Sequence, residues 1–262
     1  MQIDDFGQRI KGYESNSELL LDKDKYVIIR VDGHKFSNYT QGFEKPYDAL
    51  LSQLFIETTI ELMKQFQAVT GYTQSDEITI IIPPENLMFS GRTQKTASLV
   101  GSFTTMSFNR LLNQHILEFI NNAMINEIDN DRVRFLQSKN LGAWFDARVF
   151  NVPSKIEAFN SILWRVHDAK KNSKSMFAQK YCSHKELENL TGNEKIELAE
   201  KTTQNKWIDT PNGFKFGSLV KKEIFTINGS SRSKFVVWSE NLQYSDNNVE
   251  IITNKYKHTN KG

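Results

Sequence analysis

The sequence contains very little cysteine and no long apolar run. Cys182 is the single cysteine among 262 residues, which excludes an intramolecular disulfide and a cysteine cluster for zinc. No apolar stretch approaches the length of a membrane-spanning helix, and residues 1–6 lack the basic and apolar pattern of a secretion signal. We therefore expect a soluble protein of a reducing compartment, the cytoplasm, that does not associate with a membrane.

Charge is moderate in amount and uneven in distribution. Hydrophobic residues make up 39% and charged residues 24% of the chain, as in ordinary globular proteins, so composition alone identifies no function. Residues 1–150 hold 15 Lys and Arg against 19 Asp and Glu, whereas residues 151–262 hold 18 against 12. The second half is therefore the better candidate for contact with a polyanion, although solvated helix faces explain such an excess equally well.

The first half alternates between strand-like and helix-like patterns. Residues 25–31 are β-branched and apolar and predict a strand, and Pro46 suits the first turn of a helix that continues to about residue 66. Residues 68–74 and 78–82 predict a tight hairpin around a turn at 75–77. A second helix is expected over 95–125, and a fourth strand over 143–149. This order is the split βαβ arrangement of a ferredoxin-like sheet, hence an α+β fold.

The pattern changes beyond Pro153. Helices are expected over 156–181, 185–190 and 194–201, and late strands over 215–225 and 234–238. We therefore divide the chain into an α+β part, residues 1–153, and a basic, mostly helical extension, residues 154–262, that packs against it.

Asp32 and Asp76 are the strongest candidates for chemistry. In a split βαβ sheet the third strand pairs antiparallel with the first, so the end of the first strand lies beside the turn between the second and third. Two carboxylates that share a small space repel one another unless a cation compensates, and Mg²⁺ favours oxygen ligands. The pair therefore predicts a two-metal site, although each acidic residue alone is common in turns.

Further candidates flank this pair. Gly33 allows the backbone to approach a ligand closely, and the loop 34–37 that follows offers cationic, aromatic and hydroxyl groups. Arg92 and Lys95 are three residues apart at the start of a helix, where they could bind a triphosphate or simply be solvated.

Several motifs in this order resemble the tRNA(His) guanylyltransferases and related 3′-to-5′ polymerases. They are residues 31–36 (VDGHKF), 43–48 (FEKPYD), 72–77 (YTQSDE), 92–95 (RTQK), 145–154 (FDARVFNVPS) and 164–168 (WRVHD). The resemblance extends from residue 4 to about 182 and implies a polymerase-type palm. It also implies a reaction that activates a 5′-monophosphorylated tRNA with ATP or GTP, followed by attack of the 3′-hydroxyl of an incoming nucleotide.

The resemblance also assigns roles to individual residues. The catalytic residues would be Asp32, Asp76 and Glu77, and two Mg²⁺ ions would be bound by Asp32, the carbonyl of Gly33, and Asp76. Nucleotide would contact Asp32, Gly33, His34, Lys35, Phe36, Ser37, Ser75, Asp76, Arg92 and Lys95. The tRNA would meet Arg165, Asp168, Lys170, Lys171 and Asn172. Relatives of this kind are tetramers, so the resemblance implies a homotetramer.

One departure bears on the substrate. Eukaryotic members carry the stretch HINNLYN after the Trp-Arg element, whereas residues 170–176 here read KKNSKSM and keep one asparagine in register. This resembles the bacterial and archaeal branch, which is associated with template-dependent repair of tRNA 5′ ends.

Three other functions compete with 5′-end repair. A dedicated tRNA(His) guanylyltransferase that adds G at position −1 is the nearest of them. A nucleotide cyclase can use a related palm and a similar metal pair. A non-catalytic RNA-binding module would place stacking aromatics on its third strand, but residues 77–82 contain none.

Overall fold

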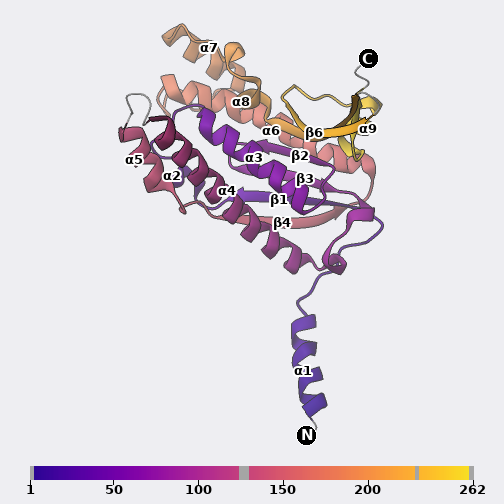
Figure 1. Cartoon of the computed structure of the whole chain (residues 1–262). Helices are drawn as coiled ribbons and strands as arrows, with labels where there is room; N and C mark the ends of the chain where they lie inside the picture. Colours follow the sequence, from indigo (N-terminus) through magenta and orange to yellow (C-terminus); the bar gives the residue numbers. More distant parts are fainter. Residues whose placement is uncertain (1–2, 124–129, 228–229, 260–262) are drawn as a thin grey trace.

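The computed structural model describes residues 3–123, 130–227 and 230–259 (Figure 1). Their strands form one seven-stranded sheet in the order β4-β1-β3-β2-β5-β6, with β7 beside β5. The strands are β1 (Tyr26–Gly33), β2 (Thr70–Gln74), β3 (Glu77–Ile82), β4 (Phe145–Val152), β5 (Ser218–Ile227), β6 (Ser230–Trp238) and β7 (Lys257–Thr259). The longer helices are α1 (Ile3–Ser15), α3 (Ala49–Gln65), α4 (Thr93–Ala123), α5 (Asn130–Lys139), α6 (Lys155–Tyr181), α7 (Gly192–Thr202) and α9 (Asp246–Thr253).

The predicted α+β fold with a split βαβ sheet is confirmed. The order β1, α3, β2, β3, α4, β4 is the predicted one, and β1 pairs antiparallel with both β3 and β4. Alternation along β1 explains how the sheet is covered on both faces. Val27, Ile29 and Val31 pack into the core beneath α3 and α4, whereas Ile28 packs into the core beneath α6.

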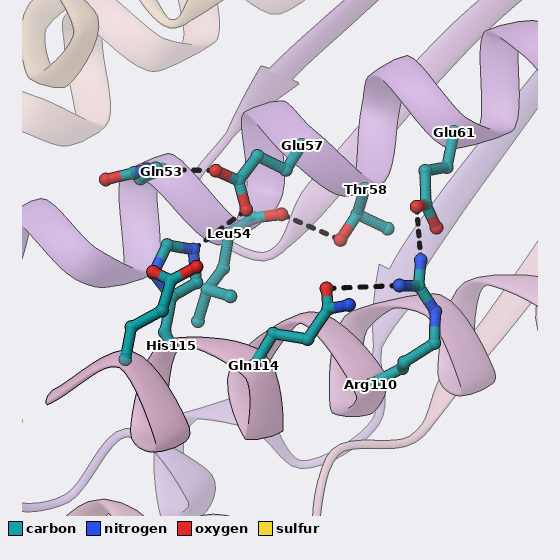
Figure 2. Close-up of polar contacts among 9 residues, drawn as sticks. Gln53, Leu54, Glu57, Thr58, Glu61, Arg110, Gln114 and His115 are labelled. Atoms are coloured by element: carbon teal, nitrogen blue, oxygen red, sulfur yellow. Dashed lines mark hydrogen bonds and ion pairs between the residues drawn. The ribbon is translucent and has the colours of Figure 1, made fainter. Parts of the chain in front are cut away.

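A polar seam joins the outer sides of α3 and α4 (Figure 2). Arg110 forms an ion pair with Glu61 and also donates to Gln114 at 3.1 Å. Five residues further along α4, His115 lies 2.9 Å from a carboxylate oxygen of Glu57. These contacts fix the register of the two helices that cover the apolar face of the palm.

The helix boundaries differ from prediction at two places in this half. Pro46 does not lie in the first turn of α3, because Asp48 caps that helix and accepts from the backbone N–H of Leu51 at 3.1 Å. Helix α4 begins at Thr93, two residues before the predicted start at residue 95, and its predicted end at residues 124–125 lies outside the described residues.

The extension is more strand-rich than predicted, and its strands continue the palm sheet. Strand β5 pairs with β2, and β6 pairs with β5, so the sheet does not end at residue 153. The strand expected from Lys215 begins at Ser218, because the short helix α8 (Asn212–Phe216) ends at Gly217, whose φ of +71° breaks the chain direction.

Residues 185–190 do not form the helix predicted for them. They form consecutive turns, because Asn189 adopts a left-handed conformation with φ +61°, which a right-handed helix cannot include. The helix predicted over 194–201 is confirmed as α7, which a capping box between Thr191 and Glu194 begins.

Helix α1 projects away from the rest of the chain (Figure 1). The sequence pattern predicted neither this helix nor α5, α9 and β7. None of the helices in the described parts of the chain is long and apolar enough to span a membrane.

Candidate active site

The end of β1 and the β2–β3 turn form the centre of the candidate site. Asp32 lies opposite Glu77 in the β1–β3 register, and the backbone N–H of Gly33 donates to the carbonyl of Asp76 at 3.1 Å. The strand order therefore places Asp32 and Asp76 at the same end of the sheet, as the split βαβ pattern predicts. On the other side of β1, Asp146 of β4 also lies opposite Asp32. Sequence reasoning did not single out Asp146, although the pairing of β4 with β1 would have placed it here.

The environment of Asp76 opposes its ionisation. Burial raises the pKa of Asp76, and the negative charge of Asp32 raises it further. A hydrogen bond from its own backbone N–H, the Ser75 hydroxyl and the positive charge of Arg165 lower the pKa in part. A cation between the carboxylates would remove this repulsion.

These donors fit a hard divalent cation. Asp32, Asp76 and the carbonyl of Gly33 offer oxygen ligands at one point of the sheet, which is the chemistry that Mg²⁺ prefers. Within the described ranges, no group of three or more His, Cys, Asp or Glu side chains is arranged to hold a metal ion alone. The remaining ligands of a bound magnesium would therefore be phosphate oxygens and water.

The loop after Gly33 is held close to the sheet. A Cβ atom at Gly33 would lie 2.5 Å from the Phe36 ring, so a larger residue cannot replace this glycine without displacing the ring. Phe36 is buried and packs edge-on against Phe55 with ring centroids 5.4 Å apart, so it anchors the loop in the core. His34 and Lys35 are exposed and free to meet a ligand.

A pocket of about 460 Å³ opens beside Asp76. Phe36, Ser37, Ser75 and Asp76 of the predicted nucleotide site lie in its wall, which the segment 43–48 continues. Its far side is formed by residues that the sequence pattern did not indicate. These are Met176, Gln179 and Lys180 of α6, with Gly213, Phe214 and Ser218. Because these segments are distant in sequence, no local spacing could have revealed the pocket.

Arg92 and Lys95 lie in a different part of the structure from Asp32 and Asp76. Arg92 bridges to Leu20 and forms an ion pair with Glu18 at 2.9 Å. The segment that contains Glu18 and Leu20 lies beside the beginning of β1. The backbone N–H of Asp22 donates to the side chain of Asn151, and Asn151 lies opposite Val27 in the β1–β4 register. From Tyr26 to Asp32, β1 spans about 20 Å at about 3.3 Å per residue, so Arg92 and Asp32 lie at opposite ends of the strand. Within one chain, the structure does not bring these two cations to the carboxylates.

The predicted RNA residues lie along one helix, α6. Lys171 and Asn172 are exposed and Lys170 is half-buried. Arg165 and Asp168 are also half-buried and lie nearer the palm, where Arg165 forms an ion pair with Glu77. Helix α6 therefore runs from the carboxylates, past the exposed lysines, to Lys180 at the pocket wall.

Comparison with known proteins connects this geometry to a family. The profile of the family described as tRNAHis guanylyltransferase matches residues 7–153, more than half of the chain. An uncharacterized protein of Acanthamoeba polyphaga mimivirus is 32% identical over 95% of this chain and 89% of its own length. The tRNA(His) guanylyltransferase of Saccharomyces cerevisiae is 27% identical over 78% of this chain and 86% of its own length.

Solved structures agree with this match. A bacterial tRNA(His) guanylyltransferase-like protein in complex with ATP superposes with a TM-score of 0.70 and 31% identity, over 88% of this chain and 91% of that one. The same kind of protein in complex with GTP gives a TM-score of 0.65 at 31% identity, over 89% and 90%. This chain belongs to the tRNAHis guanylyltransferase family and is a nucleotidyltransferase.

Proposed function

We propose that this chain repairs the 5′ end of tRNA by template-dependent nucleotide addition in the 3′-to-5′ direction, with ATP or GTP as the activating nucleotide. In the first step, an oxygen of the tRNA 5′-phosphate attacks the α-phosphorus of the triphosphate and releases pyrophosphate. In the second step, the 3′-hydroxyl of the incoming nucleotide attacks the tRNA 5′-phosphorus, loses its proton to solvent and releases the nucleoside monophosphate. Each step makes one P–O bond and breaks another.

The observation that carries this proposal is the pair Asp32 and Asp76 beside a pocket of about 460 Å³. That volume lies in the range of pockets that hold small ligands such as nucleotides. The complexes of the bacterial relative with ATP and with GTP support both nucleotides as ligands here. Lys45 and Lys180 line the same pocket and supply positive charge for phosphates.

The residues of the chain have distinct tasks in this proposal. Asp32, Asp76 and the Gly33 carbonyl would hold Mg²⁺, which when bound would neutralise phosphate charge and favour ionisation of the attacking hydroxyl. Phe36 fixes the loop through its core contacts, which keeps Ser37 in the wall of the pocket. Orienting the reacting groups in this way contributes much of the rate enhancement that such a site can provide.

Helix α6 is the proposed path of the tRNA backbone. Lys171 lies about 14 Å along the helix axis from Lys180, at 1.5 Å per residue, so the helix connects the exposed lysines to the pocket wall. Such lysines hold phosphates without reading sequence. The stretch 170–176 lacks most of the side chains that the eukaryotic stretch HINNLYN offers, which favours repair over strict recognition of tRNA(His).

The two parts of the chain would have different tasks. The palm, residues 1–153, would carry the chemistry, and residues 154–262 would contact tRNA and support assembly of a homotetramer. Light scattering coupled to size exclusion would measure the mass of that assembly. A dimer or monomer at working concentrations would contradict it.

The test of the function varies the template. Purified protein is incubated with Mg²⁺, each of the four nucleoside triphosphates and tRNAs that lack their first nucleotide, with each base opposite the gap and several anticodons. The 5′ ends are then sequenced, with Asp32→Asn as the inactive control. We expect the added base to follow the template base whatever the anticodon. Addition of G opposite every base, confined to the histidine anticodon, would instead identify a dedicated guanylyltransferase.

A further inference from the structure

Arg165 points from α6 to the same end of the sheet as the carboxylates. Its guanidinium forms an ion pair with Glu77, and its other near partner is Asp168, at 3.4 Å. The Arg165 side chain is 13% exposed and that of Glu77 is 20% exposed, so little of either reaches solvent. A planar guanidinium between two carboxylates is held in one orientation by both.

The register places Glu77 next to the site. Residues that lie directly opposite in antiparallel strands project to the same face, and Glu77 lies opposite Asp32. Glu77 also follows Asp76 directly in the chain. The Arg165–Glu77 ion pair therefore lies on the α6 face of the sheet, beside both carboxylates of the candidate site.

The backbone of Arg165 is fixed to the same sheet. Its carbonyl accepts a hydrogen bond from the hydroxyl of Tyr72 at 3.2 Å, and this tyrosine on β2 is buried. The single hydroxyl proton is shared between this carbonyl and that of Phe216, at 2.9 Å. Both the main chain and the side chain of Arg165 thus tie this turn of α6 to the palm.

We propose that Arg165 is a positioning residue of the palm rather than an RNA contact. It holds the Glu77 carboxylate in place beside Asp32 and Asp76, and Asp168 steadies the guanidinium from the other side. An RNA phosphate would have to displace two carboxylate partners to reach Arg165, and the negative charge of Asp168 would repel it. This inference rests on the proposed nucleotide addition and assigns Arg165 to that reaction.

Asp168 connects this arrangement to the exposed side of α6. It accepts a hydrogen bond from the side chain of Asn172 at 3.1 Å while it faces Arg165. Glu77, Arg165, Asp168 and Asn172 therefore form a chain of polar contacts from β3 to the proposed RNA face. Because Asp168 acts through Arg165 in this arrangement, a substitution of Asp168 should lower the kcat of nucleotide addition, as a substitution of Arg165 does.

The test separates positioning from RNA binding. Arg165→Met is compared with Lys171→Met, which removes a proposed phosphate contact, and with Lys155→Met. The last removes the α6 ion pair to Glu250, which is remote from the site, and serves as the matched structural control. For each variant we measure kcat, KM for tRNA, thermal stability, and the Kd for 5′-truncated tRNA at several salt concentrations.

We expect Arg165→Met to lower kcat by a factor on the order of a hundred, with the Kd for tRNA and its salt dependence within about twofold of wild type. Lys171→Met should instead weaken tRNA binding and reduce the salt slope by about one. Lys155→Met should change neither kcat nor Kd. Arg165→Lys, which keeps the charge, and Asp168→Asn should show the kcat loss in milder form.

A double-mutant cycle tests the partner. If Arg165 acts through Glu77, then adding Arg165→Met to Glu77→Gln should lower kcat little further, because the two substitutions interrupt one interaction. Additive losses would overturn the inference, as would an Arg165→Met protein that resembles Lys171→Met in its tRNA Kd and salt slope. An inactive wild type would refute the proposed function instead, and the binding series would still decide whether Arg165 meets RNA.

Discussion

Lys221 offers a quantitative test of the packing between the extension and the palm. It lies on β5 with no exposed surface, and its ammonium donates to the hydroxyl of Thr70 at 2.8 Å and to the carbonyl of Ile252 at 3.2 Å. It also donates to the carbonyl of Asn254 after α9. These bonds attach the end of α9 to the palm strand β2, at the cost of burying a charge.

Burial lowers the pKa of Lys221 from its ordinary 10.5 to about 7. The unfolded chain therefore binds a proton at this lysine between pH 7 and pH 10, where the folded chain does not. Stability rises with pH wherever the unfolded state binds more protons, so the folded protein should gain stability above pH 7. The shift of Lys221 corresponds to about 2 kcal/mol of added unfolding free energy between pH 7 and pH 9.

Urea unfolding at pH 7 and pH 9 measures this gain. We expect wild type to become more stable at pH 9 by about 2 kcal/mol, and Lys221→Met to show less than half of that change. Lys222→Met is the matched control, because Lys222 is the neighbour on β5 and contacts the Tyr256 ring from a less buried position. Its pH dependence should equal that of wild type. A Lys221→Met protein with the full wild-type gain would refute the argument.

Three further predictions follow from the site and the sheet. Asp76→Asn should abolish nucleotide addition yet raise the Tm of the metal-free protein, since the pKa of Asp76 is raised by burial, and a lower Tm would contradict this. Lys45→Ala and Lys180→Ala should weaken triphosphate binding more than Arg92→Ala and Lys95→Ala do, because the first two line the pocket beside Asp76, whereas Arg92 pairs with Glu18 at the other end of β1. Binding assays with each variant decide, and the reverse order would assign the triphosphate to Arg92 and Lys95. Gly217→Ala should lower the unfolding free energy, measured in urea, by more than about 2 kcal/mol. Its Cβ would lie 2.2 Å from the hydroxyl oxygen of Tyr72, and the φ of +71° disfavours any side chain. A loss below half of that value would be inconsistent with a strained contact.

The palm could be predicted because each of its strands carries its own signal. Residues 78–82 are β-branched throughout and residues 27–31 are β-branched apart from Arg30, as expected for strands buried on both faces, and turn residues bound them. Because the third strand of a split βαβ sheet pairs antiparallel with the first, the end of β1 lies beside the β2–β3 turn, so the approach of Asp32 to Asp76 could be inferred from the sequence.

The rest depended on contacts between distant segments. The pairing of β5 with β2 joins residues about 150 positions apart, and no local pattern states which edge of the sheet β5 extends. The same reason hid the ion pair between Glu77 and Arg165, because these two residues lie 88 positions apart in the sequence. The prediction of a helix over residues 185–190 was wrong for a different reason. Their apolar spacing suits a helix, but Asn189 adopts a left-handed backbone conformation that a helix cannot include.

The order and direction of the strands would have been enough to place Arg92 away from Asp32 and Asp76. Strand β3 runs antiparallel to β1, so the chain leaves β3 at the end of the sheet where β1 begins. Arg92 follows β3 by ten residues and is bridged to Leu20 just before β1, whereas Asp32 lies where β1 ends. The antiparallel pairing of β1 with β3, which brings Asp32 and Asp76 together, therefore also separates Arg92 from both. Within one chain, a triphosphate beside the carboxylates would therefore meet Lys35 of the loop after Gly33 and the pocket residues Lys45 and Lys180 rather than Arg92.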